Sequence, residues 1–240
     1  MIHPNPAQLF KAHTRGHAEN ETHRLHATFN FSEFNAESKN PFGLLTALND
    51  ETLAAQQSIE RKLSGGTLVM LLPLVGATEC HLSGNDPQIV VPGEAFTYYR
   101  HEEGSIAIKN PYEESAINFL YLTFSNAFLS DILFPQGFFI SGSNLTKKNV
   151  FHKLFEVIQN GFSAQIAIFN TRSENTYHIS NKSNGVFAFV VSGTFEIKGK
   201  LLEERDGLAL WDSAEIDMQA LSENAIMLLI EVPLNGYTAN

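Results

Sequence analysis

The sequence predicts an all-β protein built of two β-barrels, and two observations lead to this fold class. Most of the 240-residue chain reads as short apolar strands punctuated by Gly, Pro, Asn and Asp. The two halves also repeat each other loosely, because VGATECHLSG leading to VPGEAF is echoed by SGTFEIKG leading to RDGLAL. Such a repeat favours two related barrels over one large sandwich. We expect each barrel to close and thereby to pair its edge strands.

The first half contains strands that end at clear turn signals. Ala27–Phe31 (ATFNF) has strand character, and Gln88–Val91 runs into the turn Pro92-Gly93-Glu94. Ile117–Phe124 (INFLYLTF) is apolar at nearly every position, which is typical of a strand covered on both faces. These segments belong to the first predicted barrel.

The second half repeats the strand pattern from Ser163 onward. Its segments are SAQIAIFN, NTYHIS, VFAFVVSGTFEIKG, LALW, EIDMQAL and AIMLLIEV. Within the third of them, large apolar residues alternate with smaller or polar ones, as in Phe187, Phe189 and Val191. A period of two predicts a half-buried hairpin arm.

One segment between the halves departs from the strand pattern. In NVFHKLFEVIQNG, apolar residues from Phe151 to Ile158 fall at helical spacing, and Gly161 stands where a C-terminal cap belongs. We expect one short helix there. The predicted organisation is an N-terminal barrel at 1–135, a linker at 136–162 with a helix at about 147–160, and a C-terminal barrel at 163–240.

Composition excludes several function classes. The formal net charge is −10 and no basic stripe is present, so we expect no direct binding to nucleic acid. No segment approaches the about 18 uninterrupted apolar residues of a membrane span, and the N-terminus lacks the apolar core of a signal peptide. The single cysteine, Cys80, excludes an internal disulfide and suits the reducing cytoplasm, where we expect the protein to reside.

Longer motifs add a family resemblance. RGHAENETHRLHATFNFSEFN followed by PFGLLTALNDE resembles the opening of the pirin family, and FAFVVSGTFEIKGKLLEERDGLALWDSAEIDMQA resembles the second domain of bacterial pirin-like proteins. The resemblance covers residues 13–125 and 162–233. It implies a bicupin, in which two cupin barrels of the double-stranded β-helix or RmlC-like jelly-roll type face each other and the chain ends cross over. Many members hold iron in the N-terminal barrel through three histidines and a glutamate. Some resemble quercetin 2,3-dioxygenases in activity, and others are linked to regulatory protein partners.

Of the four residues at the ligand positions implied by this resemblance, only Cys80 could coordinate a metal, and one thiolate is not a site. On a strand, ligands at i and i+2 share a face, which is why cupins use His-x-His. In the stretch IERKLSGG, that pair falls on Lys62 and Ser64; the third histidine falls on Cys80 and the carboxylate near Ile108. A lysine would repel a divalent cation, serine is a poor iron ligand and isoleucine is none. We therefore expect the metal site to be lost, with Lys62, Ser64 and Cys80 still lining the barrel interior.

Displaced ligands are the alternative for a metal site. His81, His101, Glu102 and Glu103 supply two imidazoles and two carboxylates, although YYRHEEG also reads as an ordinary solvated loop. Four histidines near the N-terminus also cluster: His13, His17, His23 and His26. The resemblance explains that segment as structure, and it makes His26 a packed core residue.

Other chemistries have no motif in the chain. The sequence has no nucleophile elbow, P-loop or dinucleotide fingerprint. Cys80 lacks a base on its own strand face and is expected to be a small buried residue. The sequence thus predicts a metal-free, non-catalytic bicupin that binds a small ligand or a protein partner. The alternative is a quercetin 2,3-dioxygenase-like oxidoreductase that binds iron through displaced ligands.

Overall fold

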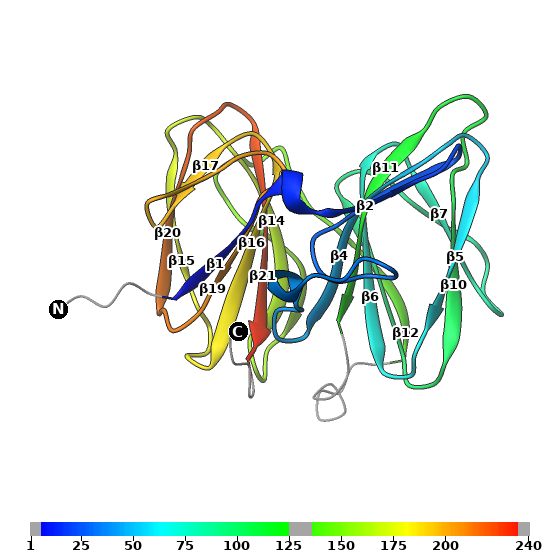
Figure 1. Cartoon of the computed structure of the whole chain (residues 1–240), viewed down its shortest axis with the longest axis horizontal. Helices are drawn as coiled ribbons and strands as arrows, with labels where there is room; N and C mark the ends of the chain where they lie inside the picture. Colours follow the sequence, from blue (N-terminus) through cyan, green and yellow to red (C-terminus); the bar gives the residue numbers. More distant parts are fainter. Residues whose placement is uncertain (1–5, 125–135, 235–240) are drawn as a thin grey trace. The chain divides into compact units, whose positions relative to one another are not determined.

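The protein is all-β, as the sequence predicts. A computed structural model describes residues 6–124 and 136–234, and these form strands, turns and two 3-10 segments, Ala12–Thr14 and Glu37–Lys39, but no α-helix. No helix in the described part of the chain is long and apolar enough to span a membrane. The described residues divide into two compact units, 16–142 and a second unit made of 6–15 with 143–234 (Figure 1).

The first unit contains two antiparallel sheets. A seven-stranded sheet has the order β12-β9-β6-β11-β4-β3-β2, and a four-stranded sheet has the order β5-β10-β7-β8. The strands are β2 (Gly16–Glu19), β3 (His23–Ala27), β4 (Leu45–Leu53), β5 (Ser58–Leu63), β6 (Thr67–Val75), β7 (Thr78–Leu82), β8 (Gln88–Val90), β9 (Glu94–Arg100), β10 (Gly104–Lys109), β11 (Ile117–Phe124) and β12 (Gly137–Gly142).

The second unit repeats this arrangement. Its six-stranded sheet has the order β1-β19-β16-β21-β14-β13, and its four-stranded sheet has the order β15-β20-β17-β18. The strands are β1 (Ala7–Phe10), β13 (His152–Val157), β14 (Phe162–Phe169), β15 (Glu174–His178), β16 (Asn184–Ser192), β17 (Phe195–Ile197), β18 (Lys200–Leu202), β19 (Gly207–Leu210), β20 (Glu215–Ala220) and β21 (Ala225–Pro233).

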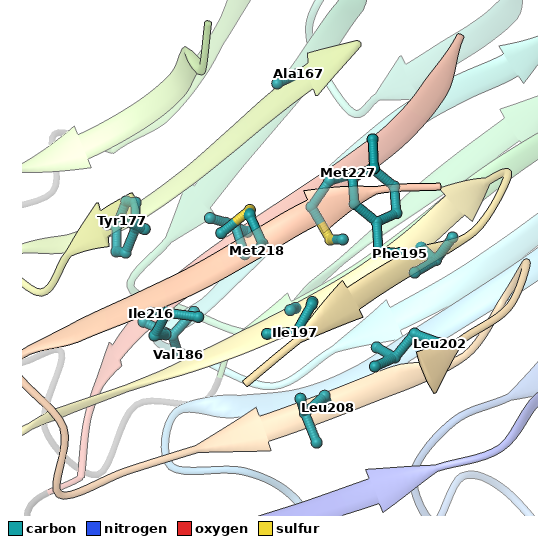
Figure 2. Packing of buried hydrophobic residues seen from close by; sticks show 14 of the residues in the cluster. Ala167, Tyr177, Val186, Phe195, Ile197, Leu202, Leu208, Ile216, Met218 and Met227 are labelled. Carbon is teal, nitrogen blue, oxygen red and sulfur yellow. The ribbon is translucent and has the colours of Figure 1, made fainter. Parts of the chain in front are cut away.

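Each unit buries an apolar core lined by strand faces with a period of two. In β20, Ile216, Met218 and Ala220 are buried while the residues between them are more exposed. Figure 2 shows Ile216 and Met218 in one cluster with Phe195 and Met227. Burial of a large apolar side chain stabilises a fold by about 1.5–3 kcal/mol, so these clusters supply the main driving force for each unit.

The first described residues belong to the second unit, whereas the sequence assigned them to the first. Strand β1 pairs antiparallel with β19, with Ala7 opposite Leu210. Buried Asp206 then holds the following turn, because its carboxylate accepts hydrogen bonds from Lys11 Nζ at 2.6 Å and from the Ala12 amide at 2.7 Å. The hydrogen bond to Asp206 raises the pKa of Lys11. Strand β1 has only four residues, which is too few for the alternation of apolar and polar side chains to assign it to a sheet from sequence.

The predicted helix at 147–160 is wrong, because residues 152–157 form β13, which pairs with β14. The ladder shifts register between Lys153 and Phe155, so Leu154 and Phe155 are both buried although they are neighbours. Because of this bulge, the buried apolar residues of β13 have a spacing in the sequence that resembles that of a helix. Ile158, the end of the supposed apolar stripe, is 83% exposed. Gly161, with φ +73°, ends the hairpin turn that follows β13 and does not cap a helix.

Barrel closure is also not found, since each unit consists of two sheets with open edges. In the first unit the chain passes from β5 to β6 through a turn that ends at Gly66, and from β6 to β7 through Gly76. Both glycines have positive φ, 75° and 73°. At such turns the backbone leaves one ladder and enters the other, which interrupts the hydrogen bonding that closure requires.

Candidate functional site

The stretch IERKLSGG spans the end of strand β5 and the turn that follows Leu63, and the structure divides its side chains between two faces. Arg61 and Leu63 are partly or fully buried, whereas Lys62 and Ser64 are exposed. The expectation that Lys62 and Ser64 line the interior is therefore wrong. A shift of one residue reverses the face of every side chain on a strand, so the inward pair at i and i+2 is Arg61 and Leu63.

Cys80 and Ile108 do lie in the interior, where they are paired across β7 and β10. Both belong to the buried apolar cluster of the first unit. Burial raises the pKa of the Cys80 thiol to about 12, so the sulfur stays protonated at neutral pH. This part of the interior is apolar and offers no anionic ligand to a cation.

A charged cluster lies beside these apolar residues. Glu51 of β4, which has no exposed surface, accepts a hydrogen bond from Arg61 Nη2 at 2.7 Å, and His23 Nε2 of β3 lies 2.7 Å from the same oxygen. Asn49 Nδ2 lies 3.4 Å from the other carboxylate oxygen of Glu51. Asn49 and Glu51 share one face of β4 because they are two residues apart, and Asn49 is paired with Tyr121 of β11. The cluster thus joins strands β3, β4 and β5.

Aromatic rings border the guanidinium group of this cluster. The Arg61 Cζ atom lies 5.5 Å from the ring centroid of Phe31 and 5.8 Å from that of Tyr121. Burial raises the pKa of Tyr121, and the positive charge of Arg61 opposes that shift. Two buried atoms of the cluster, Arg61 Nε and Asn49 Oδ1, have no hydrogen-bond partner among the described residues.

The cluster does not fit a divalent cation. Arg61 places a permanent positive charge beside the only carboxylate, and Glu51 is already engaged by two donors. Among the described residues, no group of three or more His, Cys, Asp or Glu side chains could hold a metal ion. Arg61 and Glu51 were not expected as site residues, although alternation in SIERKL places Arg61 on the inward face.

The displaced ligand candidates lie on surfaces of the first unit. His81 is on the outward face of β7, and its Nε2 atom lies 2.6 Å from Glu79 Oε1. The exposed residues His101, Glu102 and Glu103 form the turn between β9 and β10, where His101 Nδ1 lies 3.3 Å from the Tyr99 hydroxyl. His81 is thus already engaged by a carboxylate.

The N-terminal histidines serve separate roles. His17 and His26 stack at 4.7 Å on neighbouring strands, and His17 also contacts Glu19 at 3.2 Å. His26 is only half-buried on β3, on the strand face opposite the buried Leu25 and Ala27, so it is not the core residue that was expected. His13 lies in the 3-10 segment of the second unit, whereas His23 joins the Glu51 cluster.

The second unit has a buried carboxylate of its own. Glu231 of β21 accepts hydrogen bonds from Tyr177 Oη at 2.7 Å, from Asn184 Nδ2 at 2.7 Å and from the Ser180 amide at 3.0 Å. Burial, followed by the hydrogen bond to Glu231, raises the pKa of Tyr177. A β-carbon on Gly161 would lie 3.0 Å from Glu231 Oε1, so the glycine leaves room for this network. The carboxylate fixes the loop between β15 and β16.

Comparisons with known proteins agree with this architecture. Residues 157–232 match the family model of the quercetinase C-terminal cupin domain. YhhW from Escherichia coli is 19% identical, with a TM-score of 0.83 over 95% of this chain and 98% of that chain. Bacterial pirin YhhW in complex with nickel(II) gives a TM-score of 0.84 at 19% identity, over 95% of this chain and 99% of that one. A quercetin 2,3-dioxygenase from Acinetobacter baumannii is 14% identical, with a TM-score of 0.72 over 95% of this chain and 79% of that chain. None of the curated protein sequences matches the chain.

The two repeated pairs of sheets and these neighbours define the class of the protein as a bicupin. Within that class, residues 157–232 match the quercetinase C-terminal cupin family, and the fold of the chain is similar to that of the bacterial pirin YhhW. The resemblance seen in the sequence is thereby confirmed.

Proposed function

We propose that this pirin-like bicupin is non-catalytic, works without a metal ion, and acts by binding a small ligand or a protein partner. The observation that carries the proposal is the Arg61–Glu51 pair, with its 2.7 Å hydrogen bond, inside the first unit. Arg61 and Leu63 occupy the inward i and i+2 positions of β5, one residue before Lys62 and Ser64, on which the resemblance places the His-x-His pair. Ile106 and Ile108 occupy the inward positions of β10.

The electrostatics of this arrangement support a metal-free interior. Removal of a cation from a set of buried anionic ligands would leave uncompensated charge, which is costly in a low-dielectric environment. Here the charge of Glu51 is compensated by Arg61, and the neighbouring part of the interior, with Cys80 and Ile108, is apolar. The unit is therefore expected to fold and remain stable without any added ion.

The alternative is a metal-dependent oxidoreductase of the quercetin 2,3-dioxygenase kind. The description of the matched family and the likeness to the Acinetobacter enzyme favour it. It would need iron ligands outside the positions that the resemblance implies, drawn from His81, His101, Glu102 and Glu103. His81 already contacts Glu79, and the other three lie in the exposed turn between β9 and β10.

Oxygen consumption distinguishes the two functions. The protein, supplied with Fe(II) or Ni(II), is mixed with quercetin, and oxygen uptake is followed with an electrode before and after addition of EDTA. We expect uptake no faster than that of quercetin with the metal salt alone. Uptake that requires the protein and that EDTA abolishes would establish the dioxygenase. Loss of that uptake in His81→Ala and His101→Ala would then assign the displaced ligands.

The proposal also covers location and partners. A free, buried Cys80 and the lack of any other cysteine suit the reducing cytoplasm. The net charge of −10 disfavours nucleic acid as a direct partner. Fractionation of cells that produce the tagged protein would test the location, and recovery in a membrane or periplasmic fraction would overturn it.

A further inference from the structure

A surface depression borders the outward face of IERKLSGG, and its lining does not include Arg61 or Glu51 of the charged cluster. Its volume is about 600 Å³, and its charged lining consists of Glu60, Lys62, Arg100 and Glu103. Three hydroxyl groups complete the polar surface, from Ser64, Ser83 and Ser105. The volume falls within the range of about 300–1,000 Å³ that is typical of small-molecule sites.

The fold determines the position of the lining residues. Glu60 and Lys62 share the outward face of β5, and Lys62 is paired across the ladder with Ser105 of β10. At one end the β5–β6 turn packs directly on the β9–β10 turn, since a β-carbon on Gly65 would lie 2.5 Å from the His101 carbonyl oxygen. The Gly66 amide also donates a hydrogen bond of 2.7 Å to the Arg100 carbonyl. The backbones of the two turns therefore contact each other directly at the rim of the depression.

Arg100 lies in this rim because a glycine leaves space for it. A β-carbon on Gly104 would lie 3.2 Å from Arg100 Cδ and 3.3 Å from Arg100 Nη1. The nearest acidic group to the guanidinium is Glu102, at 3.7 Å, on an exposed side chain. The buried Nε atom of Arg100 has no hydrogen-bond partner within the described residues. The guanidinium is thus held in place but only weakly neutralised.

The charges in the depression differ from those farther along the same sheet face. There Glu79 contacts His81 at 2.6 Å and pairs with Lys109 at 3.4 Å, so the carboxylate and the ammonium group are already engaged. Within the described part of the chain, the side chains of Lys62, Glu60 and Glu103 form neither an ion pair nor a hydrogen bond. Two cationic and two anionic groups therefore remain available to a ligand in one concave surface.

We propose that this depression binds a small zwitterion with an ammonium and a carboxylate group, such as a short peptide. A simple anion would be repelled by Glu60 and Glu103, and a simple cation by Lys62 and Arg100. A zwitterion pairs with both signs, and serine hydroxyl groups can both donate to and accept from a peptide amide. The inference names a ligand class for the binding role proposed above and rests on that role.

Three matched probes test the ligand class by NMR titration of the intact protein. Glycylglycine carries both charges, glycylglycinamide carries only the ammonium, and N-acetylglycylglycine carries only the carboxylate. We expect glycylglycine to bind at least about threefold more tightly than either relative, because it alone can pair with both the cationic and the anionic groups of the depression. Equal affinity for all three probes, or no binding of glycylglycine, would overturn the proposal.

Single substitutions test the site. Lys62→Met should weaken glycylglycine about threefold while glycylglycinamide, which has no carboxylate, changes by less than twofold. Glu103→Gln should weaken both of these ammonium probes. Lys109→Met, on the same sheet but outside the depression, is the control and should alter neither. If Lys62→Met leaves glycylglycine binding unchanged, the peptide binds elsewhere and the proposed site is wrong. That result would not decide the proposed metal-free function, which the metal content of the protein tests separately.

Discussion

The buried Arg61–Glu51 pair gives the sharpest stability prediction. Arg61→Met removes the guanidinium but keeps an apolar side chain of similar length, and it leaves the Glu51 carboxylate without its cation. Loss of one partner of a buried ion pair costs about 3–5 kcal/mol. Arg61 keeps 22% of its side-chain surface exposed, and His23 still contacts Glu51 at 2.7 Å. We therefore expect the free energy of unfolding to fall by about 2–3 kcal/mol.

A second substitution separates charge from packing. Glu51→Gln, added to Arg61→Met, removes the uncompensated charge and should restore about 1–2 kcal/mol of the lost stability. Urea denaturation followed by far-UV circular dichroism measures all variants. Arg24→Met is the matched control, because Arg24 is exposed on β3 and should change the free energy by less than about 0.5 kcal/mol. If Arg61→Met is as stable as the parent, or the double variant is less stable than the single one, the pair does not compensate charge as argued.

Three further predictions concern buried groups. Cys80, which is buried and whose pKa is raised to about 12, should react with a small thiol reagent at neutral pH far more slowly in the folded protein than in urea; equal rates would place its strand at the surface. The pKa of Tyr177 is raised in the folded protein, so its stabilising contribution is complete below pH about 10 and is lost as the pH rises further. Tyr177→Phe should therefore reduce the fall in the free energy of unfolding at alkaline pH. An unchanged pH profile would contradict this. Gly161→Ala adds a β-carbon 2.7 Å from Ser180 Cβ at a residue with positive φ. The variant should lose about 1–3 kcal/mol of unfolding free energy, which lowers the melting temperature by several degrees. A variant as stable as the parent would show that the loop moves to accept the β-carbon.

Much of the fold could be predicted from local pattern. Ile117–Phe124 was expected as a strand covered on both faces, and β11 has those bounds with most residues buried. The strands after Ser163 were also identified, because turn residues and period-two alternation agree there. Pattern failed at β13, where a bulge buries Leu154 and Phe155 together. A bulge depends on the register with the partner strand, here the following strand β14, and is not marked by the spacing within β13 itself.

The interior of the first unit shows why its site residues were harder to find. Counting along the resemblance without gaps gave Lys62 and Ser64, one residue away from the inward positions of β5. With a period of two, that single step exchanges the inside of a sheet for its outside. Alternation in SIERKL places Arg61 on the inward face, but its 2.7 Å hydrogen bond to Glu51, whose carboxylate His23 also contacts, is seen only in the structure. Long-range charge compensation of this kind cannot be read from spacing.

The metal content of the purified protein tests the central claim most directly. The protein is produced in medium that contains iron and nickel and is purified without chelators. Inductively coupled plasma mass spectrometry then gives the number of metal ions per chain. The proposed function predicts far less than one ion of any transition metal per chain, and no gain of stability on addition of Fe(II) or Ni(II). One tightly bound ion per chain would contradict it.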